Sequence, residues 1–312
     1  MTTRRSSLVI GTRGSRLALW QAEWIQAQLK TLAPDLAVTL RTIKTSGDNI
    51  LDVPLAKIGG KGLFVKEIEE ALLREEIDLA VHSMKDVPTQ LPEGLAIVCV
   101  PAREDPRDAL IGRNGLPLAG LPEGARVGTS SLRRQAQLLH HRPDLTIQML
   151  RGNLDTRLRK LGEGEYDGII LAAAGLRRMG WLDQVTDYLP FDICLPAIGQ
   201  GALGLEARSG DPFVGELVGR LEHGPTRTAV TAERALLERL EGGCQVPIAA
   251  HATVDGGTLV LDGLIASVDG KRVIRDQVRG VVSEARSLGL GLGERLLASG
   301  GDRILNEIYG RA

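Results

Sequence analysis

Leu8-Val-Ile-Gly-Thr-Arg-Gly-Ser15 is the stretch that decides how the chain begins to fold. Its apolar start predicts a short buried strand, and the spacing of apolar side chains after Ser15 predicts an amphipathic helix. Those side chains are Leu17, Trp20, Trp24, Ile25 and Leu29. Arg13 therefore stands at a strand end between Gly11 and Gly14, where backbone N–H groups and a planar guanidinium can meet an anion.

The same combination of arginine, glycine and hydroxyl residues recurs at later strand ends. The arginines concerned are Arg133, Arg134, Arg151 and Arg157. The first two follow Gly128-Thr-Ser-Ser131, which also suits the N-cap of a helix. Several such turns in one chain predict a ligand that carries many negative charges. We expect Arg133 or Arg134 to point to solvent or a cleft, because two charged side chains should not both face the core.

Strand and helix patterns alternate over most of the chain, which predicts parallel sheets covered by helices. Strands are expected at residues 8–10, 38–43, 78–82, 95–100, 145–150 and 168–172. After about residue 222 the pattern changes to a helix over 227–240, followed by antiparallel strands over 248–254, 258–268 and 272–278. This last part is expected to form a smaller α+β domain.

Composition narrows the functional classes. The 312 residues hold 38 Lys+Arg and 39 Asp+Glu, so a general nucleic-acid coat is not expected. Aromatic content of 3% is low for base stacking, and no apolar run is long enough to span a bilayer. Three scattered cysteines without a CxxC motif indicate neither a zinc site nor a disulfide framework. We expect a cytoplasmic protein with reduced thiols, no metal, and no requirement for more than a monomer.

Cys244, in Glu241-Gly-Gly-Cys-Gln-Val-Pro-Ile248, is the most distinctive single residue. A loop cysteine beside glycine is not expected to fill a core, and its thiolate fraction near neutral pH leaves it open to alkylation. Cys99 lies in an apolar run and His82 ends a strand, so both are expected to be structural. Asp86 would stay ionised in a cationic cleft and could stabilise a developing cation.

Two other functions fit some of these features. A non-enzymatic clamp for a dicarboxylate or phosphate would explain the arginines, although it needs neither Cys244 nor Asp86. A cysteine-dependent acyl transferase would explain Cys244, although it needs a histidine partner that no motif supplies.

The chain resembles the porphobilinogen deaminase family over essentially its whole length. The segments that carry the resemblance are Gly11-Thr-Arg-Gly-Ser-Arg-Leu-Ala-Leu19, Lys61-Gly-Leu-Phe64, Ala80-Val-His-Ser-Met-Lys-Asp-Val-Pro88, Gly128-Thr-Ser-Ser-Leu-Arg-Arg-Gln135, Leu150-Arg-Gly-Asn153, Thr156-Arg-Leu158, Leu171-Ala-Ala-Ala-Gly175, Leu195-Pro-Ala-Ile-Gly-Gln-Gly-Ala202 and Glu241-Gly-Gly-Cys244. Any one of them could arise by chance, but all of them in this order are highly specific.

The resemblance implies an α/β fold: two domains like those of periplasmic binding proteins, hinged around a cleft, and a smaller C-terminal α+β domain. The implied domains are residues 1–101 with 202–219, residues 107–195, and residues 223–312. The resemblance also implies a transferase of tetrapyrrole (haem) synthesis. Such an enzyme joins four porphobilinogen molecules head to tail, with loss of ammonia, onto a dipyrromethane bound to Cys244 as a thioether. It then releases hydroxymethylbilane.

The resemblance assigns residues to this chemistry. Asp86 is the catalytic carboxylate, and a loop with Lys57 and Lys61 forms a lid. Cofactor-binding residues are Cys244, Ser83, Lys85, Asp86, Thr129, Ser131, Arg133 and Arg134. Substrate-binding residues are Arg13, Ser15, Gln21, Arg151, Arg157 and Gln200.

Overall fold

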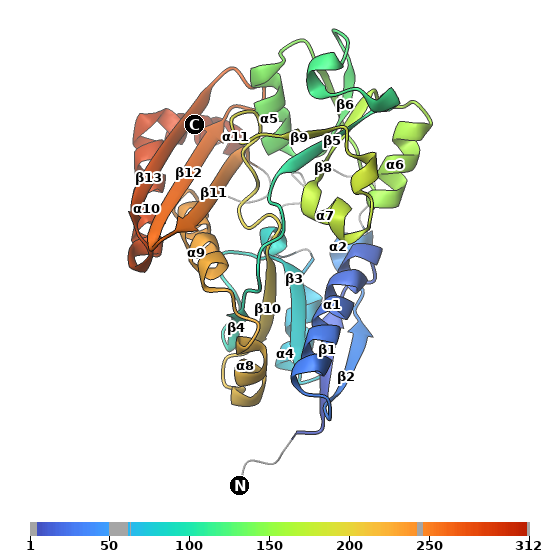
Figure 1. The fold of residues 1–312 in the computed structure, drawn as a ribbon. Coiled ribbons are helices and arrows are strands. Elements are labelled where there is room, and N and C mark those ends of the chain that lie inside the picture. The colour runs from blue at the N-terminus through green and yellow to red at the C-terminus, as the bar shows by residue number, and fades with distance from the viewer. Residues whose placement is uncertain (1–4, 50–61, 63, 242–245, 311–312) are drawn as a thin grey trace. The chain divides into compact units, whose positions relative to one another are not determined.

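A computed structural model describes residues 5–49, 62, 64–241 and 246–310. They form two compact units (Figure 1). The first consists of residues 5–49, 62, 64–104 and 202–227, and the second of residues 105–201, 228–241 and 246–310. The division into three domains with the boundaries given above stays a prediction.

The first unit is built on a five-stranded sheet in the order β2-β1-β3-β10-β4. Its elements are β1 (Ser7–Thr12), α1 (Arg16–Leu32), β2 (Ala37–Thr42), α2 (Ser46–Asn49), α4 (Lys66–Leu73), β3 (Leu79–Ser83), the 3-10 turn η1 (Met84–Asp86), β4 (Leu95–Cys99), β10 (Leu203–Arg208) and α8 (Pro212–Gly219). Leu8 and Ile10 pack with α1 and α8, whereas Val9 packs with α4 on the other face. This alternation places helices on both faces of the sheet.

The second unit contains another five-stranded sheet, in the order β7-β6-β8-β5-β9. Its elements are β5 (Asp108–Gly112), η2 (Arg113–Gly115), η3 (Leu118–Gly120), β6 (Arg126–Gly128), α5 (Leu132–His141), β7 (Thr146–Gln148), α6 (Leu154–Gly162), β8 (Gly168–Ala172), α7 (Ala173–Arg178), η4 (Leu182–Gln184) and β9 (Asp187–Leu189). Apolar residues of α5 pack on one face, and those of α6 and α7 pack on the other.

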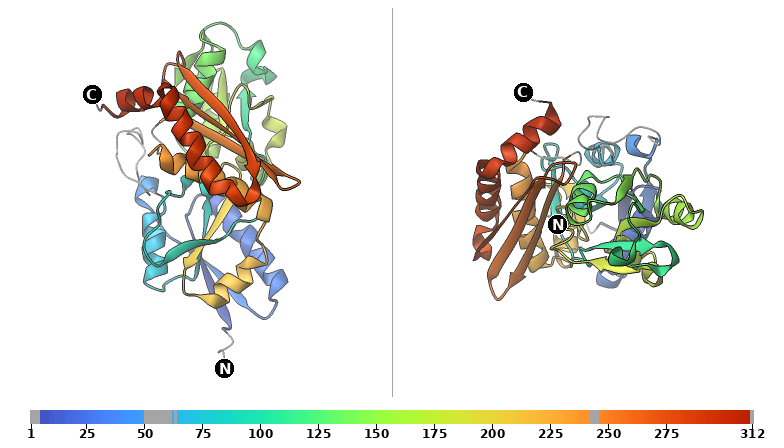
Figure 2. Two further views of the ribbon diagram at one scale, coloured as in Figure 1. Left: turned by 90° about the vertical axis from the view of Figure 1, so that its left-hand side faces the viewer. Right: turned by 90° about the horizontal axis from the view of Figure 1, so that it is seen from above.

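A three-stranded antiparallel sheet, β11-β12-β13, belongs to the same unit. The elements of this part of the chain are α9 (Gly224–Arg239), whose first residues belong to the first unit, β11 (Ile248–Asp255), β12 (Thr258–Ala266), β13 (Val273–Val281), η5 (Val282–Glu284), α10 (Ala285–Leu296), the π-helical turn η6 (Leu297–Gly301) and α11 (Asp302–Tyr309). Helix α10 lies along one face of the sheet (Figure 2). Gly263 leaves room there, because a Cβ atom would lie 2.7 Å from a methyl carbon of Leu236.

The expectation of parallel sheets is wrong for one strand position in each large sheet. β10 runs antiparallel to both β3 and β4, and β5 runs antiparallel to both β8 and β9. The other predicted alternations hold, including the antiparallel strands after residue 222. A helical crossover returns a strand in its starting direction, but neither β5 nor β10 follows a helix from its own sheet.

None of the described helices combines the length and the low charge that a membrane crossing needs. Cys99 is fully buried, as predicted.

Candidate active site

The first unit gathers predicted site residues where two neighbouring strands end. β1 and β3 are parallel partners, so their carboxyl ends meet at one edge of the sheet. β1 leads into Arg13, and β3 leads into η1, which carries Asp86. Ser15 starts α1 as its N-cap, because its side chain accepts a hydrogen bond from the N–H of Ala18 at 3.3 Å.

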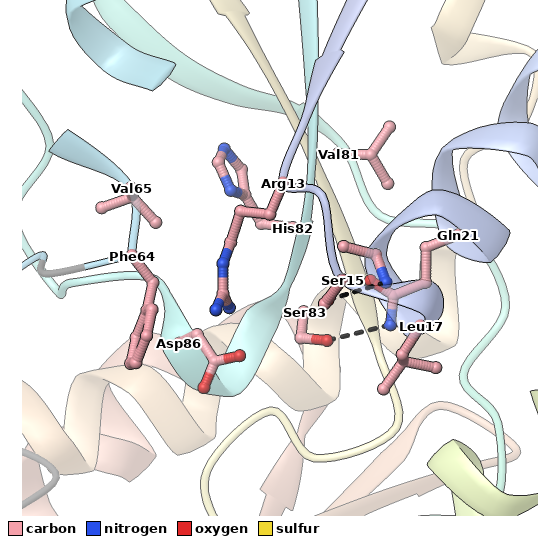
Figure 3. Close-up of a pocket in the computed structure, with 11 residues that line it drawn as sticks. Arg13, Ser15, Leu17, Gln21, Phe64, Val65, Val81, His82, Ser83 and Asp86 are labelled. Atoms are coloured by element: carbon pink, nitrogen blue, oxygen red, sulfur yellow. Dashed lines mark hydrogen bonds between the residues drawn. The ribbon is translucent and has the colours of Figure 1, made fainter. Parts of the chain in front are cut away.

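These strand ends line one pocket (Figure 3). Its lining includes Arg13, Ser15, Gln21, Ser83 and Asp86, together with Phe64 and His82. The amide nitrogen of Gln21 donates to Ser83 Oγ at 3.1 Å, and the guanidinium carbon of Arg13 lies 4.2 Å from the ring centroid of Phe64. Lys85 lies on the same turn as Asp86 but does not line this pocket. A carboxylate and a guanidinium thus face one space, which suits a ligand with both acidic and cationic parts.

In the second unit, the hydroxyls of Thr129 and Ser131 organise the start of α5. Thr129 Oγ1 accepts from the N–H of Ser131 at 3.1 Å, and Ser131 Oγ accepts from the N–H of Arg134 at 3.4 Å. The N-cap predicted from Gly128-Thr-Ser-Ser131 is therefore confirmed. Neither hydroxyl donates a hydrogen bond to another residue described by the structure, so each keeps a proton for a ligand.

Asp108 is the residue that the sequence interpretation missed. It is fully buried at the start of β5 and accepts hydrogen bonds from three predicted site residues. These are Arg133 Nη1 at 2.7 Å, Arg134 Nη2 at 2.7 Å and Nε at 3.0 Å, and Gln200 Nε2 at 2.9 Å. The sequence could have indicated this role, because Asp108 is a charged residue at the start of the apolar run Asp-Ala-Leu-Ile-Gly112. An aspartate in a buried strand needs cationic partners.

The expectation that Arg133 or Arg134 points to solvent or a cleft is wrong. Their residues are only 5% and 6% exposed, and the shared carboxylate makes this burial tolerable. Burial alone would raise the pKa of Asp108, but the charges of Arg133 and Arg134 outweigh it and hold that pKa well below the ordinary value. The cluster has two cations and one anion, so it keeps a net positive charge.

Arg157 extends this positive region. Burial, together with the charges of Arg134 and Arg151, lowers its pKa to about 10, so three guanidinium groups lie close together. Arg157 donates from Nε to the carbonyl of Gly152 at 2.9 Å, and it has no carboxylate partner among the residues that are described. Gly152 makes this turn with φ of 111°, where a Cβ atom would lie 2.7 Å from Thr156. This concentration of positive charge suits a polyanion.

Cys244, Lys57 and Lys61 lie outside the described residues. The donors available in the second unit fit a ligand with acidic side chains, since Thr129, Ser131 and Arg133 all offer N–H or O–H groups. Only Nη1 of Arg133 has partners among the described residues, so these residues do not use its Nε–H and Nη2 donors.

Comparisons with known proteins indicate one family over almost the whole chain. The family model "Porphobilinogen deaminase, dipyromethane cofactor binding domain" matches residues 8–216, and "Porphobilinogen deaminase, C-terminal domain" matches residues 227–298. Porphobilinogen deaminase of Geobacter sulfurreducens is 61% identical over 304 residues, covering 97% of this chain and 95% of the relative. That of Syntrophotalea carbinolica is 62% identical over 300 residues, covering 96% and 95%. Among solved structures, a probable amino-acid ABC transporter extracellular-binding protein from Bacillus subtilis aligns with a TM-score of 0.42 and 10% identity over 70% of this chain and 90% of that chain.

Asp108→Asn should lower the free energy of unfolding by about 3–5 kcal/mol, because two buried guanidinium groups lose their counter-charge. The pKa of Asp108 is depressed in the folded state, so its contribution is full above the ordinary value of 3.8 and is lost as pH falls below it. Urea denaturation at several pH values should therefore show the largest deficit near neutrality. Glu163→Gln, which removes an exposed partner of Arg159, should cost less than about 1 kcal/mol. Equal effects of the two changes would contradict the role of Asp108.

Proposed function

Because the chain belongs to the porphobilinogen deaminase family, we propose that its clustered arginines bind the acidic pyrroles of this reaction and that Asp86 is the catalytic carboxylate. The enzyme is a transferase of tetrapyrrole synthesis. It joins four porphobilinogen molecules head to tail onto a bound dipyrromethane, with loss of ammonia at each addition, and releases hydroxymethylbilane.

The observation that best supports the site assignment is the cluster of Arg134, Arg151 and Arg157. Each pyrrole carries an acetate and a propionate, so a growing chain gains negative charge with every unit. The charges of this cluster repel one another and lower the pKa of Arg157. Carboxylates that bind among these guanidinium groups would reduce this repulsion. We assign Arg151 and Arg157, together with Gln200, to the substrate side chains.

The pocket of the first unit supports a complementary role. Its proposed substrate contacts are Arg13, Ser15 and Gln21. Loss of ammonia from porphobilinogen leaves an electron-poor carbon, and positive charge gathers on the pyrrole nitrogen. The carboxylate of Asp86 would stabilise that charge most strongly in the transition state, where the charge is greatest.

A third set of residues is assigned to the primer. We assign Ser83, Lys85 and Asp86 in the first unit, and Thr129, Ser131, Arg133 and Arg134 in the second, with Cys244 as the point of attachment. When bound, the dipyrromethane supplies the free pyrrole position to which the first substrate is joined. The remaining N–H donors of Arg133 and the hydroxyl protons of Thr129 and Ser131 are donors of the kind that its acidic side chains require.

Two further assignments complete the proposal. Lys57 and Lys61 belong to a lid that limits the access of water during reaction. We also propose that the enzyme is a monomer and that it works in the cytoplasm; the described cysteines, Cys99 and Cys194, are free buried thiols of the kind that reducing compartments keep, which supports the compartment. Membership of the family removes the two rival functions, the non-enzymatic clamp and the acyl transferase.

Cys244→Ser should abolish covalent attachment of pyrrole without unfolding the chain, because only the thiol can form the thioether. Intact mass under denaturing conditions, with an aldehyde colour test for pyrroles, should show an adduct of two linked pyrroles on the wild-type protein and none on the variant. Cys99→Ala should retain the adduct. A chromophore that persists on Cys244→Ser would move the attachment site elsewhere.

Asp86→Ala should fold and bind porphobilinogen but lower kcat by at least about a hundredfold, as expected when a group that stabilises transition-state charge is removed. Single-turnover release of ammonia measures this step, and circular dichroism checks the fold. Near-normal turnover in the variant would refute the role of Asp86.

Arg157→Gln should raise KM about ten- to a hundredfold, because one charge-assisted hydrogen bond contributes roughly 1.5–3 kcal/mol. Arg159→Gln is the matched control, since Arg159 lies on the same helix, is exposed and pairs with Glu163. Steady-state kinetics at two salt concentrations should show a shallower salt dependence for Arg157→Gln alone. Equal KM values in both variants would remove Arg157 from the site.

A further inference from the structure

A buried polar chain runs behind the pocket of the first unit. His82 on β3 faces Glu206 on β10, and its Nε2 lies 2.8 Å from Glu206 Oε2. The side chains are 4% and 0% exposed. Glu69, on α4, is also buried and interacts electrostatically with both. Two carboxyl groups and one imidazole thus share an apolar interior, although the reaction described above uses none of them.

The two carboxyl groups are incompletely paired. Glu206 Oε1 and Glu69 Oε1 are buried and have no hydrogen-bond partner among the residues that the structure describes. A buried carboxylate oxygen without a donor is costly, so the pair is more stable when one carboxyl carries a proton. Burial and then the charge of Glu206 raise the pKa of Glu69 to about 7, and His82 opposes this rise only in part. Near neutral pH, Glu69 therefore exchanges between its neutral and charged forms.

The charged groups around Glu69 are few. Helix α4 packs on β1, β3, β4 and β10. The ionisable side chains of these elements that can face it are His82 from β3 and Glu206 and Arg208 from β10, besides Lys66, Glu67 and Glu70 of α4 itself. Arg208 is held by the carbonyls of Leu72 and Ile77 and by Asp78. Cys99 of β4 packs on the other face of the sheet, with α1 and α8. Glu206 and His82 remain as the groups that set the charge of Glu69.

This chain reaches the pocket through His82. His82 lines the same pocket as Asp86, and the next residue, Ser83, accepts the hydrogen bond from Gln21 (Figure 3). When Glu206 is the acceptor, Nε2 of His82 must carry a proton, and the ring orientation is fixed. A neutral Glu69 then leaves one carboxylate opposite one imidazole. A charged Glu69 places a second anion in the same interior and weakens that arrangement.

We propose that Glu206 and Glu69 are positioning residues that hold His82 as a hydrogen-bond donor in the wall of the pocket that carries Asp86, and that turnover falls when a negative charge on Glu69 disturbs this arrangement. This inference rests on the proposed function of that pocket. His82 acts here through its fixed ring orientation, and no covalent step is assigned to it.

The test compares pH profiles of kcat and KM in the holoenzyme. In the wild type, kcat should fall as pH rises through about 7, because the favoured neutral form of Glu69 is lost. Glu69→Gln mimics that neutral form and should move the fall upward by at least about one pH unit, with KM within about twofold. Glu70→Gln, its half-exposed neighbour on α4, is the matched control and should leave the profile unchanged. A Glu69→Gln profile that matches the wild type would overturn the proposal.

Glu206→Gln provides the second arm. It replaces the buried carboxyl group that faces His82 and should lower kcat about tenfold or more at every pH, with KM little changed. If either variant fails to fold, the imidazole NMR shifts of His82 in the wild type decide instead. They should move around pH 7, and constant shifts between pH 6 and 8 would overturn the proposal. Asp86→Ala, assayed in parallel, distinguishes a failure of the proposed site from a failure of this inference. Near-normal turnover of Asp86→Ala would contradict the proposed site. An inactive Asp86→Ala, together with Glu69 and Glu206 variants that behave like the wild type, would contradict this inference alone.

Discussion

The interaction on which the second unit depends is one buried carboxylate shared by two buried guanidinium groups. Without Asp108, neither Arg133 nor Arg134 could be withdrawn from water at tolerable cost. The single anion cannot balance both cations. The positive charge of Arg134 therefore still acts on Arg157 and lowers its pKa. Asp108 therefore makes the cluster stable enough to exist, while it leaves the cluster positive enough to attract acidic side chains.

The first unit places its carboxyl groups differently. Asp86 lines its pocket together with Arg13, and the carboxyl group of Glu206 lies in the interior behind His82. An acidic surrounding is suited to stabilising positive charge on a pyrrole nitrogen, and a basic one to holding carboxylates. The two kinds of site that the reaction requires are thus built on separate sheets, each with a local charge balance of its own.

Sequence patterns predicted the strand-end turns well, because the determinants of a turn are local. Ser15 and Ser131 cap the helices expected of them, and Arg13 and Asp86 share the edge that parallel strands create. Strand direction was not predictable for β5 and β10, since apolar periodicity carries no information about direction. Asp108 was missed because its partners lie 25 to 92 residues away along the chain. The burial of Arg133 and Arg134 was not predicted for the same reason, because it depends on their contact with Asp108.

The acidic pair behind His82 is difficult to explain by stability. A carboxyl group with a raised pKa favours the folded state only while it is protonated, so stability falls as pH rises from the ordinary value of 4.5 through about 7. An apolar side chain of similar volume at Glu69 would avoid that loss. Residues that reduce stability at working pH are characteristic of functional sites, where a fixed charge or orientation matters more than the fold. Glu69 and Glu206 can fix the position of His82 in the pocket wall, and this role explains why two carboxyl groups are buried there. Neither Glu69 Oε1 nor Glu206 Oε1 has a hydrogen-bond partner among the described residues that would give a structural reason for their burial.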